Sequence, residues 1–253
     1  MNEVTVADYR DLLAGLASES VDAVITDPPF GIGYVNHYTH TRHASVIGDD
    51  APFSYAELAR HAYRVLKPDT AFLAFTDWQS YPGHFHDVAA AGFKMKEPLI
   101  CQKRPAGTAD LYGAFQSNAD WILFAHKGRF VFRETQLLRN KRAGTVPNVG
   151  RNPVPEYKRR FPSCWFGPEF PSGSENPASL LSRAYPHPTV KTLQLLQWLI
   201  ALTTDLGGIV VDPFVGTGTT AVAAAQCGRN FIAGDVSPAC VAMASRRLVA
   251  PVG

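Results

Sequence analysis

Cysteine is scarce in this sequence of 253 residues, and paired cysteines are missing from it. The four cysteines, Cys101, Cys164, Cys227 and Cys240, are far apart, and none forms the C-x-x-C pair used by zinc and redox sites. They favour neither a structural zinc site nor a disulfide framework. We therefore expect free thiols in the reducing environment of the cytoplasm.

Signals for membranes and secretion are also lacking. No stretch approaches the roughly 18 consecutive apolar residues that a membrane-spanning helix needs. The first residues include Glu3 and Asp8, and no basic stretch leads into an apolar run, so we expect no secretory signal. The sequence predicts a cytoplasmic protein with no membrane partner.

Acidic residues are scarce in one segment of a chain whose formal net charge is only +2. Between Lys127 and Arg160 there are ten Lys and Arg but two Glu, whereas the remainder holds 14 basic and 20 acidic residues. A mildly acidic body with one strongly basic segment favours a polyanion bound at one place. From charge alone, a solvated basic loop without a partner is the alternative.

Apolar runs and helical periods alternate along most of the chain. The run Val21–Thr26 is typical of a strand buried on both faces of a parallel sheet. Further strands are predicted at 4–8, 71–76, 99–102, 121–125, 208–211 and 230–233, and helices near 12–16 and at 55–66, 84–91, 190–204, 219–226 and 238–248. This alternation predicts an α/β fold with a mostly parallel, twisted sheet and helices on both faces.

The regular pattern stops after Lys127. Nine of the nineteen prolines lie between Ala143 and Pro188, which excludes a central strand there. The simplest architecture is one domain interrupted by a basic, loop-rich insertion. We divide the chain into residues 1–126, an insertion at 127–186, and residues 187–253.

A glycine-rich turn follows the predicted strand at 208–211. The run Asp212-Pro-Phe-Val-Gly-Thr-Gly-Thr219 reads as strand, tight turn and helix, and its glycines allow a sharp turn and the close approach of a ligand. Asp235 follows the next strand, where nucleotide-binding folds place a carboxylate on ribose hydroxyls. No Lys follows Gly218, which argues against a nucleoside triphosphate. A bare structural turn is the alternative.

A proline-rich turn ends the first buried strand. In Asp27-Pro28-Pro29-Phe30 the two prolines fix a rigid turn, so that Asp27 and the Pro28 carbonyl present two acceptors. Two acceptors can hold both N–H groups of an exocyclic base amine and position its nitrogen to attack a methyl sulfonium. Phe30 would stack on a base flipped out of the duplex. The alternative is a strand-ending turn with Asp27 as a cap.

Together and in this order, the two motifs resemble the amino-group DNA methyltransferases of the permuted β class. In that family the Asp-Pro-Pro-Tyr/Phe motif precedes the cofactor motif, with the target-recognition region between them. The segment His187-Pro-Thr-Val-Lys191 also resembles the family's His-Pro-Thr-x-Lys motif. The resemblance covers nearly the whole chain, and it implies a Rossmann-like methyltransferase fold with S-adenosylmethionine as cofactor.

The resemblance also implies roles for particular residues. Catalysis falls to Asp27, Pro28, Pro29 and Phe30 in the first part of the chain. Residues expected at the cofactor are Asp8 (adenine), Thr189 and Lys191 (methionine end), Asp212, Phe214, Gly216, Gly218, Thr219 and Asp235 (ribose). The insertion would be the target-recognition region that binds double-stranded DNA through Arg133, Arg139, Lys141, Arg142, Arg151, Lys158, Arg159 and Arg160.

Four positions depart from the usual family pattern. They are Phe30 for Tyr, Asp120 for Glu, Thr192 for Pro and Asp235 for Glu, and none removes a group that the chemistry needs. His37, His40 and His43 are spaced like metal ligands, but methyl transfer needs no metal, so we predict no metal site and a lid over the target base instead.

The target base and the partners are less determined. The Asp of Asp-Pro-Pro favours the N6 amine of adenine by resemblance, since cytosine-N4 enzymes usually carry Ser there, but cytosine N4 stays open. An RNA substrate and a catalytically silent DNA-binding protein are further alternatives. A cognate restriction endonuclease is a possible partner, and the chain could be a monomer or a homodimer.

Overall fold

A single twisted sheet organises the computed structural model, which describes residues 2–29, 53–102, 118–133, 163–166 and 191–249. The described residues form nine strands in the order β1-β9-β8-β2-β3-β6-β5-β7, with β4 also paired to β6. Neighbours run parallel from β1 (Asn2–Val6) through β9 (Asn230–Asp235), β8 (Ile209–Asp212) and β2 (Val21–Thr26) to β3 (Leu66–Thr76). The mostly parallel α/β sheet predicted from the alternating pattern is therefore confirmed.

The remaining strands complete one side of the sheet. Strand β6 (Ala119–His126) is antiparallel to β3, to β4 (Lys94–Met95) and to β5 (Leu99–Gln102), and β7 (Cys164–Phe166) lies parallel to β5 at the edge. The five strands from β1 to β3 thus all end on one side, which we call the carboxyl edge; their starts form the amino edge.

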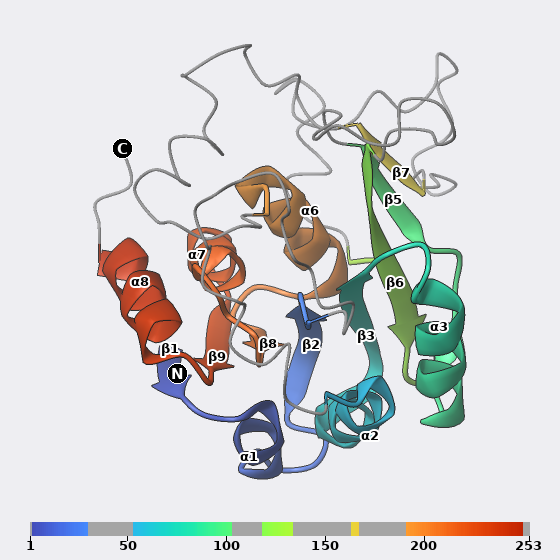
Figure 1. The fold of residues 1–253 in the computed structure, drawn as a ribbon, viewed down its shortest axis with the longest axis horizontal. Helices are drawn as coiled ribbons and strands as arrows, with labels where there is room; N and C mark the ends of the chain where they lie inside the picture. Colours follow the sequence, from blue (N-terminus) through green and yellow to red (C-terminus); the bar gives the residue numbers. More distant parts are fainter. Residues whose placement is uncertain (1, 30–52, 103–117, 134–162, 167–190, 250–253) are drawn as a thin grey trace, which may run out of the picture.

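Helices cover both faces of the sheet. One face carries α1 (Tyr9–Ala14), α2 (Tyr55–Val65) and α3 (Tyr81–Ala90), and the other carries α6 (Leu193–Thr203), α7 (Thr219–Gln226) and α8 (Pro238–Val249), as Figure 1 shows. No helix within the described ranges is long and apolar enough to cross a membrane.

Strand β3 shows why the buried strands read as continuous apolar runs. Its side chains alternate between two cores: Leu73 and Phe75 pack with residues of α6 and α7, while Phe72 and Ala74 pack with residues of α1 and α2. Each of these four side chains is almost fully buried. A central parallel strand has no solvent face, so polar residues are pushed to its ends.

Several strands depart from the sequence prediction: β1 spans 2–6 rather than 4–8, β4 was not predicted, and β3 and β7 differ most. Strand β3 begins at Leu66 rather than Ala71, because Leu66 already pairs with Val21. The next pair is Ala23 with Ala71, so a register shift accommodates residues 67–70, which include Asp69 at φ 64°. Strand β7 lies inside the predicted loop-rich insertion, where Cys164 pairs with Ile100. An edge position suits a short strand in a proline-rich segment, since edge strands tolerate irregular neighbours.

Candidate active site

The carboxyl edge gathers aspartates from five neighbouring strands. Each parallel strand ends in an aspartate or is followed closely by one: Asp8 after β1, Asp235 in β9, Asp212 in β8, Asp27 after β2 and Asp77 after β3. The antiparallel strand β6 begins at the same edge, because Trp121 pairs with Thr76, and so adds Asp120. The carboxyl ends of strands are where open α/β sheets bind ligands. Asp77 and Asp120 were not predicted as site residues, although a carboxylate after a buried strand is the signal that identified Asp27.

The Asp27 carboxylate forms an ion pair with Lys191. Lys191 Nζ lies 3.2 Å from Asp27 Oδ2, and the two side chains are 12% and 24% exposed. The ammonium also lies 4.4 Å from the centre of the Phe75 ring. Burial lowers the pKa of Lys191, but the carboxylates of Asp27 and Asp120 outweigh it and leave this pKa raised. A charged lysine therefore faces the predicted catalytic carboxylate, whereas the resemblance had assigned Lys191 to the cofactor.

Asp212 joins the proline turn to the glycine turn. Its buried carboxylate accepts a hydrogen bond from Thr26 Oγ1 at 2.7 Å and another from the Phe214 backbone N–H at 3.2 Å. Burial raises the pKa of Asp212 to about 6, against the lowering effect of these hydrogen bonds. Because Thr26 directly precedes Asp27, this contact fixes the proline turn relative to the glycine turn.

Glycine is required at the two positions of the turn for different structural reasons. Gly216 has φ 49°, and its N–H donates to Asp235 Oδ2 at 3.0 Å. Gly218 has φ 83° at the N-cap of α7, and a Cβ there would lie 2.7 Å from the Cβ of Ala244. The second glycine thus makes room for α8. From the sequence we expect the glycines to allow both a sharp turn and the approach of a ligand, and the positive φ of Gly218 agrees with the sharp turn.

Asp8 and Asp235 meet at one corner of the carboxyl edge. Val6 pairs with Asp235 across the sheet, and Asp8 follows two residues later. Asp235 Oδ1 accepts from the Ser237 N–H at 2.9 Å, while Asp8 caps α1 through the Arg10 N–H at 2.8 Å. Both carboxylates are partly exposed. The structure therefore brings together the residues predicted for ribose and for adenine.

Phe214 contributes to an aromatic cluster beside this corner. Its ring centre lies 5.3 Å from that of Tyr9 and 5.5 Å from that of Phe53. The cluster continues to Tyr55, which stacks on His84 with ring centres 3.7 Å apart. Sequence reasoning missed Tyr9, Tyr55 and His84, because they lie in helices whose apolar period explains them as core.

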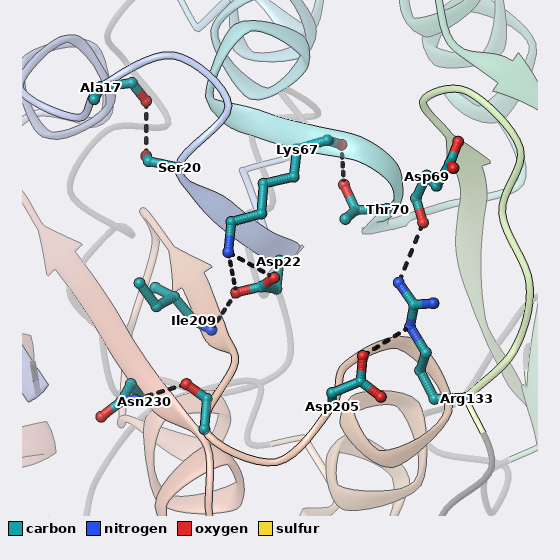
Figure 2. Close-up of polar contacts among 11 residues, drawn as sticks. Ala17, Ser20, Asp22, Lys67, Asp69, Thr70, Arg133, Asp205, Ile209 and Asn230 are labelled. Carbon is teal, nitrogen blue, oxygen red and sulfur yellow. Dashed lines mark hydrogen bonds and ion pairs between the residues drawn. The ribbon is translucent and has the colours of Figure 1, made fainter.

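Arg133, a predicted DNA contact, lies at the amino edge. Its Nε is 3.5 Å from Asp205 Oδ2, and its backbone N–H donates to the Leu202 carbonyl at 2.8 Å. Figure 2 shows this guanidinium between Asp205 and Asp69. Arg133 is therefore on the side of the sheet away from Asp27, and its contacts are those of a structural residue.

Several predicted residues lie outside the described ranges. They are Phe30, Thr189, and the basic residues Arg139, Lys141, Arg142, Arg151, Lys158, Arg159 and Arg160, together with His37, His40 and His43. Thr219 is described, and its hydroxyl accepts a hydrogen bond from Arg247. The described part of the chain contains no group of three His, Cys, Asp or Glu residues arranged to hold a metal ion.

Comparison with known proteins gives one family. The model of the DNA methylase family that covers N6 and N4 enzymes matches residues 21–246, which include both turns. YhdJ of Escherichia coli strain K12, a DNA adenine methyltransferase, is 26% identical over 98% of this chain and 83% of its own. The type II methyltransferase M2.DpnII of Streptococcus pneumoniae is 27% identical over 96% of this chain and 88% of its own.

Solved structures of similar proteins share the fold. M1.HpyAVI in complex with S-adenosylmethionine aligns with a TM-score of 0.67 at 22% identity, over 99% of this chain and 100% of that one. The cytosine-N4-specific PvuII DNA methyltransferase aligns with a TM-score of 0.71 at 17% identity, over 99% of this chain and 87% of that one. The predicted Rossmann-like methyltransferase fold is thereby confirmed.

Proposed function

Because this chain belongs to the family of N6-adenine and N4-cytosine DNA methyltransferases, we propose that it methylates the N6 amine of adenine in a short duplex DNA sequence. Family membership confirms the resemblance drawn from the two motifs and their order. The family depends on S-adenosylmethionine, which confirms the predicted cofactor. The residue roles and the choice of base are our proposals.

One observation carries the assignment of the active site. The hydrogen bond of 2.7 Å from Thr26 Oγ1 to Asp212 Oδ1 joins the ends of β2 and β8. These strands are neighbours, with Val24 paired to Val211. The turn proposed to hold the target amine thus directly adjoins the turn proposed to hold the methyl donor. Methyl transfer requires such proximity, because donor and acceptor must be held in line.

The carboxyl edge has the chemistry that the cofactor requires. S-adenosylmethionine carries a sulfonium and an ammonium, which an edge lined with aspartates favours. Asp235 is proposed to bind the ribose hydroxyls and Asp8 the adenine, since both carboxylates are partly exposed at one corner. Phe214 would contribute an apolar wall from the aromatic cluster. The bound cofactor supplies an electrophilic methyl group.

Asp27 is proposed to bind and orient the target amine. Its carboxylate accepts an N–H of the amine, with the Pro28 carbonyl as second acceptor, and stabilises the positive charge that develops on nitrogen. Lys191, at 3.2 Å from Oδ2, holds the carboxylate in one orientation. Pro28 is buried, which restricts movement of the turn.

Duplex DNA is the proposed substrate, and the target base must leave the helix to reach this edge. The basic insertion at 127–186 is proposed to bind the DNA, since it holds 11 of the 24 Lys and Arg but only four acidic residues. Arg133 is the exception: its contacts at the amino edge support a structural role. A restriction endonuclease partner stays a prediction, as does the choice between monomer and homodimer.

Adenine and cytosine can be separated by one experiment. Adenine is favoured because Asp27 occupies the first position of the catalytic motif and YhdJ is named an adenine enzyme. Cytosine N4 is the second candidate, because the PvuII enzyme shares the fold with a TM-score of 0.71.

Methyl-tritium from S-adenosylmethionine is incubated with the chain and genomic DNA, and the digested nucleosides are separated. We expect label in N6-methyladenine. Label only in N4-methylcytosine would overturn the adenine assignment, and label in structured RNA offered as competitor would overturn the DNA substrate.

A further inference from the structure

Helix α8 holds the glycine turn through a residue that belongs to neither motif. Arg247 Nη1 donates to the Thr217 carbonyl at 2.7 Å and lies 3.0 Å from both the Thr217 and Thr219 hydroxyls. Both threonines are almost fully buried, at 4% and 6% exposure. Hydrogen bonds from a part-buried guanidinium are strong, because the donor is charged.

The same helix contacts the turn at a second point. Ala244 lies one helical turn before Arg247, and its Cβ and Cα would be 2.7 and 2.8 Å from a Cβ placed on Gly218. The turn also has bonds of its own, from the Gly218 N–H to the Val215 carbonyl at 2.7 Å. Between them, Ala244 and Arg247 fix Gly218 and the two threonines that flank it.

We propose that Arg247 is a positioning residue for the cofactor turn. It holds Thr217 and Thr219 and so keeps the turn in one conformation where α7 begins. This contact matters there because Gly218, the N-cap of α7, provides no side-chain hydrogen bond to the helix. The Thr219 hydroxyl then stabilises the turn by accepting a hydrogen bond from Arg247, whereas the family resemblance implied a contact with the cofactor. This proposal rests on the proposed cofactor site, because the turn would position the methyl donor next to Asp27.

The test compares Arg247 with its neighbour Arg246. Both lie in the last turn of α8, but Arg246 is exposed, so Arg246→Gln is a matched control for loss of charge. We expect R247Q to raise the KM for S-adenosylmethionine about tenfold, the usual effect of one lost charged hydrogen bond. The kcat at saturating cofactor and DNA should stay near that of wild type. R247K, which keeps a cationic donor, should recover part of the loss.

A double-mutant cycle with Thr219→Val tests the route of the effect. If Thr219 acts through Arg247, T219V should add little to R247Q, whereas direct binding of the cofactor by Thr219 would make the two effects additive. T219V also keeps the test decisive if R247Q does not fold, since a normal KM in folded T219V would contradict the proposal.

The outcomes separate this proposal from the proposed function. An unchanged KM in folded R247Q, or a lowered kcat with unchanged KM, would overturn the positioning role alone. Failure of the wild-type chain to bind S-adenosylmethionine by calorimetry would overturn the proposed function and this inference with it.

Discussion

Acidic residues at the two edges of the sheet have different kinds of partner. At the amino edge, ion pairs with basic side chains neutralise the acids: Asp22 with Lys67 at 2.8 Å and Glu19 with Lys127 at 2.9 Å. Figure 2 shows the polar contacts of this edge, in which Asp22 also accepts the Ile209 N–H. These contacts join the starts of neighbouring strands, so their consequence is stability.

At the carboxyl edge, neutral donors hold three of the six aspartates. Asp212, Asp235 and Asp77 accept hydrogen bonds from backbone N–H groups or a threonine hydroxyl, which orient the carboxylates without cancelling their charge. The other three face basic side chains: Asp27 is paired with Lys191, which also faces Asp120, and Asp8 forms an ion pair with Arg10 at 3.3 Å. The negative charge kept at this edge suits a cationic cofactor. From this difference we predict that substitutions at the carboxyl edge change activity and those at the amino edge change stability.

The largest expected effect compares the two ends of strand β2. Asp27→Asn should reduce methyl transfer by at least about 100-fold, because the amide no longer stabilises positive charge on the amine. Asp22→Asn, five residues earlier on the same strand, should leave the rate of the folded protein unchanged and lower the free energy of unfolding by about 1 kcal/mol. Single-turnover methylation at saturating S-adenosylmethionine and urea unfolding measure the two quantities.

The proposed difference between the edges would be contradicted if Asp22→Asn, rather than Asp27→Asn, lowered the rate of methyl transfer. A folded Asp22→Asn variant with a rate as low as that of Asp27→Asn would show that the edges are not functionally separate. Full activity of Asp27→Asn would remove Asp27 from the catalytic group.

The buried carboxylate of Asp212 should make stability fall as the pH rises. Its pKa is about 6 in the folded chain and 3.8 in an unperturbed carboxyl, so the folded state binds more protons between these values. The free energy of unfolding should therefore decrease from about pH 4 to about pH 6, by at most about 3 kcal/mol. Asp212→Asn should lose this dependence.

Urea unfolding of both proteins at several pH values isolates the contribution, because every other titrating group is shared. The stability of Asp212→Asn relative to wild type should rise through this window and level off above it. A constant difference would show that the pKa of Asp212 is not raised in the folded protein.

Much of the carboxyl edge could be predicted from the sequence, because local signals mark it. The bounds of β2, β5 and α7 follow from apolar runs that end at proline, glycine or charged residues, and the structure has them at the predicted residues. Parallel strands end on one side, so a carboxylate after each strand is enough to assemble Asp27, Asp212 and Asp235.

Contacts between distant segments could not be predicted in this way. The Lys191–Asp27 pair spans most of the chain, and the bonds of Arg247 to Thr217 connect two elements that share no sequence pattern. Strand β7 pairs with β5 from within a proline-rich segment, where local propensity predicts only loop. Charge counting grouped Arg133 with the other basic residues of the insertion, and composition could not show that it lies at the amino edge beside Asp205.

The smallest expected effect concerns Arg133 and tests whether the amino edge is free of DNA. Each phosphate contact contributes about 0.9 to the slope of log affinity against log salt. Arg133→Gln should leave this slope unchanged and lower the free energy of unfolding by less than about 1 kcal/mol, since Asp205 is 76% exposed. The triple substitution of Arg139, Lys141 and Arg142 by Gln should make the slope shallower by up to about 2.7.

Binding of a labelled duplex at several salt concentrations measures the slope for both variants and for wild type. A slope reduced by about 0.9 in Arg133→Gln would mean that DNA contacts the amino edge as well, and a flat slope in wild type would remove the basic insertion from the DNA interface.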